Sequence, residues 1–339
     1  MFKKITSIFL ISMFIFSSIF LVSNNSVSAS TNIDGYKVIN PSTTQQFTEK
    51  IYLQTTEDGK TQRITKSEYV KLKEIEELKS KVKKEYKDNN ENTIVNSESI
   101  DSYIPVENNE NNKKEEAPTA KAATVSYVEV NSSISYNQAK GTIDLSSKID
   151  KLVGIPPTII ISGVNLYSSK SYEGTYSKVT GFTDEWTGLE IKVGTKASKS
   201  YKVTSSNWWI AKANTVAGWA GSTTPESEQT QTSPKLTNKK AVLYPVIYNE
   251  HSKKYMPVPE RANIPVVPLE KRAPWNTTLR GQYIKLYIDT YGNPGWDWKP
   301  IDIHHVIPRE YGGGNNFSNL YPLPRTMHQN VVNPWWINY

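Results

Sequence analysis

Three of the chain's four histidines lie in one short stretch near the C-terminus, "DIHHVIPREYGGGNNFSNLYPLPRTMHQ". His304 and His305 are adjacent, and His328 follows 23 positions after the second of them. Two imidazoles can hold one divalent cation and leave coordination positions for phosphate oxygens and water. A third imidazole with a pKa near neutrality can take a proton from the attacking water. These residue types at this spacing therefore suit metal-assisted hydrolysis of a phosphodiester bond.

The segments around the histidines predict how they are positioned. "IDIHHVIP" is typical of a short strand that ends at Pro308, "GGGNN" of a tight loop, and "NLYPLP" of a second strand. "RTMHQNVV" predicts a helix that ends before Asn333 and Pro334. In such a ββα unit the helix packs across the hairpin, so its histidine can return to the first strand. Adjacent strand residues point to opposite sides, which gives His304 and His305 different tasks.

This ordered set of elements resembles the HNH family of His-Me finger endonucleases. The likeness rests on "HHVIP", then "GG", then "NNFSNL", then a histidine in the following helix, and the closing "HQNVVNPWW" resembles secreted bacterial HNH toxins. It covers roughly residues 275–339, about a fifth of the chain. The resemblance implies a ββα-metal finger and an endonuclease that hydrolyses nucleic acid.

Carried over position by position, the resemblance implies a role for each motif residue. His304 and His328 become the two metal ligands, and His305 becomes the general base. Asn319 becomes the residue that fixes the geometry of the loop and the base. The implied cofactor is one divalent metal ion, with Mg²⁺ favoured and Mn²⁺, Ni²⁺ or Zn²⁺ as alternatives.

Two departures from the family pattern stand out. Some members have another histidine one helical turn after the helix ligand, where this chain has Val332, and others have a CxxC zinc knuckle, which a chain without Cys cannot form. We therefore expect only two firm protein ligands. Asp302 is a candidate third ligand or an acceptor behind a ligand. Arg309 and Arg325 flank the site, and each either holds phosphate or simply lies on the surface.

The C-terminal segment that contains the three histidines also carries most of the net positive charge. From Lys235 onward there are 13 Lys and Arg against 7 Asp and Glu, a net charge of +6, whereas residues 30–234 carry about −1. A basic segment suits a polyanionic partner, so we expect a nucleic acid substrate, with DNA favoured. A toxin of this kind also has a cognate immunity protein as a candidate partner.

The N-terminus predicts export. "MFKK" precedes an apolar stretch, "ITSIFLISMFIFSSIFLV", and small residues follow it up to Ala29. This order predicts a signal peptide and a secreted, extracellular protein with no membrane span after cleavage. The apolar stretch is also long enough for an uncleaved anchor, which is the competing interpretation. The absence of Cys excludes disulfides and thiol chemistry.

Upstream of the histidines, periodicity and composition divide the rest of the chain. After Thr65, apolar residues recur every three or four positions, which predicts an amphipathic helix, either solvated with one buried face or paired in a coiled coil. An Asn-, Glu- and Lys-rich stretch predicts a linker. Alternating β-branched and aromatic runs then predict an antiparallel β-sandwich. The expected divisions are 1–29 signal peptide, 30–86 N-terminal region with the helix, 87–121 linker, 122–221 β-sandwich-like domain, 222–236 linker, and 237–339 α+β nuclease domain with the finger.

A rival function from a different class stays open at this point. The chain also fits a cell-surface or wall-binding protein whose β-sandwich carries the function and whose finger is degenerate. Trp208 and Trp209 either stack on a sugar or peptidoglycan strand or belong to the core. We expect Trp335 and Trp336 to be core residues, and we assign no role to His251.

Overall fold

The computed structural model describes residues 30–33, 35–56, 60–89, 124–222 and 225–339. The predicted signal peptide lies outside the described residues, as does the predicted linker 87–121 apart from its first three positions. Within the described part of the chain, no helix is both long and apolar enough to cross a membrane.

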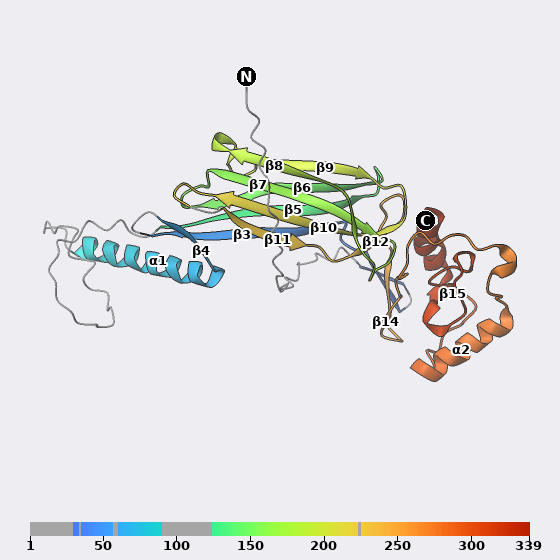
Figure 1. Ribbon diagram of the computed structural model, residues 1–339. Helices are drawn as coiled ribbons and strands as arrows, with labels where there is room; N and C mark the ends of the chain where they lie inside the picture. Colours follow the sequence, from blue (N-terminus) through green and yellow to red (C-terminus); the bar gives the residue numbers. More distant parts are fainter. Residues whose placement is uncertain (1–29, 34, 57–59, 90–123, 223–224) are drawn as a thin grey trace, which may run out of the picture.

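Antiparallel strands are the main regular structure of the described chain, and two sheets of them lie face to face (Figure 1). One sheet has the order β4-β3-β5-β6-β9, and the other has the order β11-β10-β7-β8 with β12 paired to β10. The bounds are β3 Thr44–Thr55, β4 Thr61–Ile64, β5 Thr124–Asn137, β6 Thr142–Val153, β7 Ile159–Ser169, β8 Ser177–Thr187, β9 Lys196–Lys202, β10 Asn207–Gly218, β11 Glu226–Gln231 and β12 Lys235–Thr237. The predicted β-rich domain is therefore confirmed.

The core between the two sheets follows from the alternation of side chains along the strands. Inward-facing residues such as Ile134 and Leu145 of the first sheet meet Leu166 and Trp209 of the second in one apolar cluster. In an antiparallel strand every second side chain faces the same way, and Ser133 and Ser135 on either side of Ile134 are polar and only partly buried. The alternation of apolar residues in the sequence therefore accounts for the burial of this core.

One acidic side chain breaks the apolar pattern. Glu49 of β3 is 1% exposed, and its carboxylate accepts hydrogen bonds from the hydroxyls of Ser132 and Thr230. Burial raises the pKa of Glu49 to about 7, because a charged carboxylate is poorly solvated between the sheets. The two hydroxyl bonds offset only part of that effect.

The boundaries expected for the sandwich, 122–221, were too narrow. β3 and β4 come from the N-terminal region, and β3 pairs with β5 along its whole length. The predicted linker 222–236 contains β11 and β12, which pair with β10. β11 reads "ESEQTQ" and lies at a sheet edge, where backbone hydrogen bonds hold a strand that has no apolar side chains.

The predicted helix is present as α1, Lys66–Asn89. A reciprocal cap starts it: Thr65 N donates to the Glu68 carboxylate over 2.6 Å, and Glu68 N donates to the Thr65 hydroxyl over 3.2 Å. The Tyr69 ring packs against rings of β3 and β5. Ile75 and Leu78 are 49% and 63% exposed, so the expected buried face is absent at these two positions.

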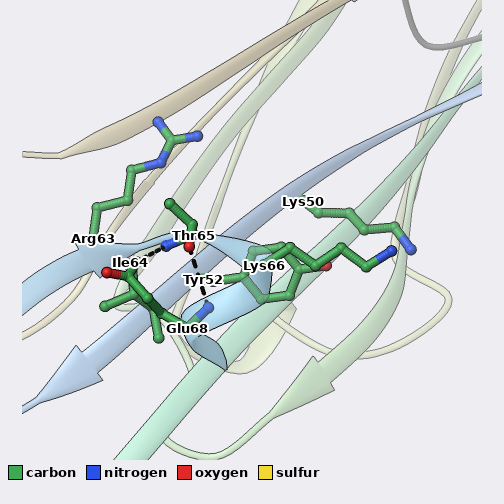
Figure 2. A pocket seen from close by; sticks show the side chains of 7 residues that line it. All are labelled: Lys50, Tyr52, Arg63, Ile64, Thr65, Lys66 and Glu68. Atoms are coloured by element: carbon green, nitrogen blue, oxygen red, sulfur yellow. Dashed lines mark hydrogen bonds between the residues drawn. The ribbon is translucent and has the colours of Figure 1, made fainter. Parts of the chain in front are cut away.

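A shallow depression lies where α1 meets β3 and β4 (Figure 2). Lys50 on its rim pairs with Glu129 over 3.0 Å, and Arg63 pairs with Glu228. The charges that line it are therefore largely offset within the chain. It lies at the opposite end of the sandwich from the histidine motif (Figure 1), and we assign it no chemistry.

The C-terminal region packs against the other end of the sandwich (Figure 1). It contains a small sheet of order β1-β2-β13-β14 and a hairpin of β15 and β16. Its strands are β1 Ser30–Ile33, β2 Tyr36–Ile39, β13 Val246–Asn249, β14 Lys254–Tyr255, β15 Ile301–His305 and β16 Leu320–Pro324. Its helices are α2 Thr277–Tyr291, α3 Arg325–Met327, a π-helical turn His328–Val332 and α4 Asn333–Ile337, with 3₁₀ turns at Leu269–Lys271, Arg309–Tyr311 and Phe317–Asn319. The sandwich has one further 3₁₀ turn, Gly188–Glu190.

The predicted strand, loop, strand, helix order is present, but the helix does not end before Asn333. The chain stays helical to Ile337, because the π-helical turn His328–Val332 leads directly into α4, whose first turn contains Pro334. Trp335 and Trp336 are 2% and 7% exposed in the core below it. The prediction that these two tryptophans are core residues is confirmed.

The boundary expected for the nuclease domain, 237–339, also left out two strands, because β1 and β2 belong to the C-terminal sheet. β2, at the start of the described chain, pairs with β13 in the C-terminal sheet. Tyr36 of β2 is 1% exposed, and its hydroxyl accepts a hydrogen bond from Asn249 Nδ2 over 3.2 Å. The same Asn249 amide donates to the Tyr287 hydroxyl of α2 over 3.2 Å. The C-terminal unit is therefore built from both ends of the chain.

Candidate active site

The histidine pair lies on β15, the first strand of the hairpin. His304 is 3% exposed, whereas the adjacent His305 is only partly buried, because successive strand residues point to opposite sides. α2 supports this strand from outside: Tyr283 and Tyr287 pack on Ile303. The strand thus presents two imidazoles in two different environments.

His304 meets His328, the third histidine of the motif. His304 Nδ1 lies 3.1 Å from His328 Nε2, and the two ring centroids are 5.0 Å apart. His328 begins the π-helical turn that crosses the hairpin, which is how it returns to the first strand. The Nε2 atom of His304 is buried and has no hydrogen-bond partner in the described part of the chain.

Asp302 lies behind His328. One carboxylate oxygen is 3.1 Å from His328 Nδ1, and the other accepts from Arg325 Nε over 3.1 Å. Arg325 Nη2 also donates to the Lys299 carbonyl over 2.9 Å. A carboxylate on one imidazole nitrogen fixes the ring and makes the other nitrogen a better ligand. In this structure Asp302 contacts the nitrogen of His328 that faces away from His304, so it is placed to orient a candidate ligand rather than to act as a third ligand.

Asn319 braces the loop between the two strands. Its Oδ1 accepts from Ile307 N over 2.9 Å, and its Nδ2 donates to the carbonyls of Ile307 and Gly314 over 3.1 and 2.8 Å. The loop must also bend tightly at Gly313, where an added Cβ would lie 1.6 Å from the Ile307 oxygen. Only glycine fits there. Asn319 touches the loop and not the ring of either histidine.

His305 is held by a different asparagine. Its Nε2 lies 2.9 Å from Asn315 Oδ1, and Asn315 Nδ2 donates to the Pro274 carbonyl over 2.7 Å. The Trp275 ring stands edge-on to His305 at 4.9 Å between centroids. The sequence analysis did not single out Asn315 or Trp275. "NN" after the glycines was the only available signal for the first, and nothing in the sequence indicated the second.

Burial lowers the pKa of both strand histidines. The shift is large for His304, where the positive charges that His328 and His305 would carry add to it. For His305, burial is again the main cause, Arg309 lowers the pKa further, and the bond to Asn315 opposes the shift. Both rings are therefore neutral at physiological pH, the form in which an imidazole binds metal or accepts a proton.

The other residues considered from the sequence are Arg309, His251, Trp208 and Trp209. Arg309 donates its Nε to the Ala273 carbonyl, which holds the lead-in segment near the site. His251 Nε2 is 3.0 Å from the Gly292 carbonyl, away from the other histidines. Trp208 and Trp209 are 5% and 1% exposed, so the interpretation of this pair as core residues is confirmed.

The donors that converge at His304 and His328 fit a single metal ion held by two side chains. Two nitrogens that bind one ion at about 2.0–2.1 Å lie roughly 2.9–3.4 Å apart in octahedral or tetrahedral geometry, and the observed separation is 3.1 Å. Among the described residues, no group of three His, Cys, Asp or Glu side chains could hold an ion. The position one turn after His328 is occupied by Val332, which is buried in the core.

No protein family, no curated protein and no solved structure matches the chain. The likeness to HNH endonucleases therefore depends on the motif residues and on the geometry described above.

Proposed function

We propose that the chain is a metal-dependent endonuclease that hydrolyses phosphodiester bonds of nucleic acid. The observation that carries the proposal is the 3.1 Å approach of His304 and His328, with His305 adjacent on the same strand and held separately. Two imidazoles suited to a metal and a third suited to a proton are the minimum set for this hydrolysis.

Each residue has a distinct task in the proposed reaction. His305 accepts a proton from a water molecule, the water oxygen attacks phosphorus, and the bond to the leaving sugar oxygen breaks. His304 and His328 would hold the metal ion, which when bound offsets negative charge on the phosphate and on the leaving oxygen. Asp302 keeps the His328 ring turned toward His304. Asn319 keeps the loop closed behind the strand.

The charge of the C-terminal region supports nucleic acid as the substrate, with DNA favoured. Its net charge is +6, and Arg325, whose side chain is 53% exposed, lies beside Asp302 at the site. Binding that depends on phosphate contacts weakens steeply with salt, because condensed counterions are released. The steepness of that salt dependence measures how many phosphates the region contacts.

The predicted secretion would place the nuclease activity outside the producing cell. An exported nuclease either degrades extracellular nucleic acid or attacks competitor cells, and in the second case a cognate immunity protein protects the producer. The β-rich domain would then contact the cell wall or the target surface. These parts of the proposal rest on the N-terminal sequence and on the resemblance.

The test is cleavage of supercoiled plasmid by residues 30–339, with Mg²⁺, Mn²⁺, Ni²⁺ or Zn²⁺ and with a chelator. The whole mature chain is needed, because β2 belongs to the C-terminal sheet. We expect nicking that the chelator and His305→Ala abolish. His251→Ala is the matched control, since it removes a histidine outside the site. No cleavage by the wild-type chain with any of these ions, on DNA or RNA, would overturn the proposal.

A further inference from the structure

The His305 ring is held on one nitrogen only. Nε2 is hydrogen-bonded to Asn315. Nδ1 makes no hydrogen bond to any residue that the structure describes, and it is not buried. A neutral imidazole carries its proton on one nitrogen and a lone pair on the other. The partner of Nε2 therefore decides which nitrogen can act as a base.

The Asn315 amide has only one orientation that fits its surroundings. Pro274 presents a carbonyl oxygen, which can only accept, so the amide nitrogen of Asn315 must face it, at 2.7 Å. The amide oxygen is then the atom that faces His305, at 2.9 Å. Since an amide oxygen can only accept, Nε2 of His305 must carry the proton.

We propose that Asn315 is the positioning residue that holds His305 in its Nε2–H tautomer and directs Nδ1 toward the attacking water. The inference rests on the proposed function, which makes His305 the base, and it deepens that function by naming the side chain that prepares it. Asn319, the residue implied by the family pattern, braces the loop, whereas Asn315 acts on the base itself.

The segment before α2 completes this arrangement. Ala273 accepts from Arg309, Pro274 accepts from Asn315, and Trp275 lies edge-on to the His305 ring. Three consecutive residues of the lead-in thus contact three residues of the finger. Trp275 limits rotation of the imidazole, and Pro274 fixes the amide that selects its tautomer. The proline-rich lead-in is therefore part of the site rather than a simple connection.

Removal of the Asn315 acceptor should allow His305 to adopt either neutral tautomer and should leave its ring free to rotate. With Asn315→Ala, neutral His305 can place its proton on either nitrogen, so only part of the population keeps an unprotonated Nδ1. Loss of an outer partner of a catalytic imidazole typically lowers activity about 10–100-fold. Asn315→Asp loses the N–H that donates to Pro274 but keeps an acceptor oxygen for His305 Nε2, so it should preserve the tautomer. Asn316→Ala is the matched control, because the adjacent Asn316 is exposed and makes no side-chain cap.

The direct test is nitrogen NMR of the metal-free full chain with ¹⁵N-labelled histidine, at a pH near 8 where the His305 ring is neutral. His305→Ala identifies the His305 signals among the four histidines. We expect Nε2 to appear protonated and Nδ1 unprotonated in wild type, Asn315→Asp and Asn316→Ala, and a mixture in Asn315→Ala. An unchanged tautomer in Asn315→Ala, or an Nδ1–H tautomer in wild type, would overturn the proposal.

Single-turnover plasmid cleavage separates this inference from the proposed function. If wild type cleaves and Asn315→Ala is about 10–100-fold slower with unchanged substrate affinity, the positioning role is supported. If wild type and Asn315→Ala cleave at equal rates, the positioning role fails and the nuclease stands. If wild type does not cleave at all, the proposed function fails, and the NMR result still reports whether Asn315 sets the tautomer.

Discussion

The Nδ1 atom of His304 lies 3.1 Å from the Nε2 atom of His328, although 24 positions separate the two residues in the chain. The hairpin brings the π-helical turn back over the first strand, and Asp302 holds His328 from its far side. His305, one residue away, takes no part in this contact. In the proposed mechanism, metal binding and proton transfer therefore belong to separate side chains that can be changed independently.

Replacement of His305 or His328 by alanine should have different effects on metal binding. His305→Ala should lower cleavage about 10²–10⁴-fold, the usual contribution of a general base, with metal affinity unchanged. His328→Ala should weaken metal binding, because one of two ligands is lost. Calorimetric titration with Mn²⁺ and plasmid cleavage together check this. Identical metal titrations for the two variants would show that the roles are misassigned.

Asp302→Asn should weaken metal binding about 10–100-fold without removing a ligand. Asn keeps the size of the side chain but loses the carboxylate charge that orients His328 and pairs with Arg325. Asp297→Asn, at an exposed position before the strand, is the control. Equal affinities for Asp302→Asn and wild type would mean that the carboxylate does not support the ligand.

Cleavage should decline only below the ordinary histidine pKa. Burial lowers the pKa of His304 and His305, so both rings stay neutral as pH falls through 6.5 and take up protons at lower pH. Protonation then removes the base and competes with metal at the ligands. Rate profiles at rising metal concentration test this, because metal can rescue only the ligand part. Complete rescue at acid pH would show that His305 is not the base.

The buried Glu49 should make the sandwich less stable at high pH. Its pKa is raised from 4.5 to about 7, so the folded chain binds more protons than the unfolded chain between these values. Stability is therefore lost as pH rises through this range, by about 3 kcal/mol once the carboxyl is charged. Glu49→Gln should recover most of this near pH 8 and little near pH 4.5, measured by urea unfolding. Glu74→Gln, on the exposed face of α1, should change neither value.

Tyr36 should matter to the proposed nuclease activity although it lies far from the histidines in sequence. Tyr36→Ala removes a buried ring from the C-terminal core, which costs about 3–5 kcal/mol for an aromatic residue. Tyr36→Phe removes only the bond to Asn249, worth about 1 kcal/mol. Thermal unfolding with plasmid cleavage checks both. A fragment 237–339 as stable and active as the whole chain would contradict the role of β2.

Local patterns in the sequence predicted the elements but not their partners. The alternation that predicts the sandwich strands and the spacing that predicts α1 are properties of neighbouring residues, as is the strand, loop, strand, helix order around His304. The pairing of β2 with β13 and the edge position of β11 depend on backbone contacts between distant segments. Polar edge strands have no apolar signature, so β11 looked like a linker.

Within the candidate site, too, the sequence predicted the elements but not the contacts between side chains. The motif placed His304, His305 and His328 in their elements, because each lies in a segment with a clear pattern. It did not distinguish Asn315 from Asn319, since the path of the loop decides which amide reaches the ring and which braces the backbone. Trp275 reaches His305 only because the lead-in segment folds back over the loop, a route that no short pattern describes.

The shared sheet of β2 and β13 sets an order of folding. Tyr36 and Asn249 are 213 positions apart, so their encounter in an unfolded chain closes a very long loop. Once the sandwich has formed, only the short connections from β2 to β3 and from β12 to β13 remain to be closed, and the entropic cost of that step falls by about 2–3 kcal/mol. We therefore expect the sandwich to form before the C-terminal sheet, and competence for cleavage to appear last on refolding.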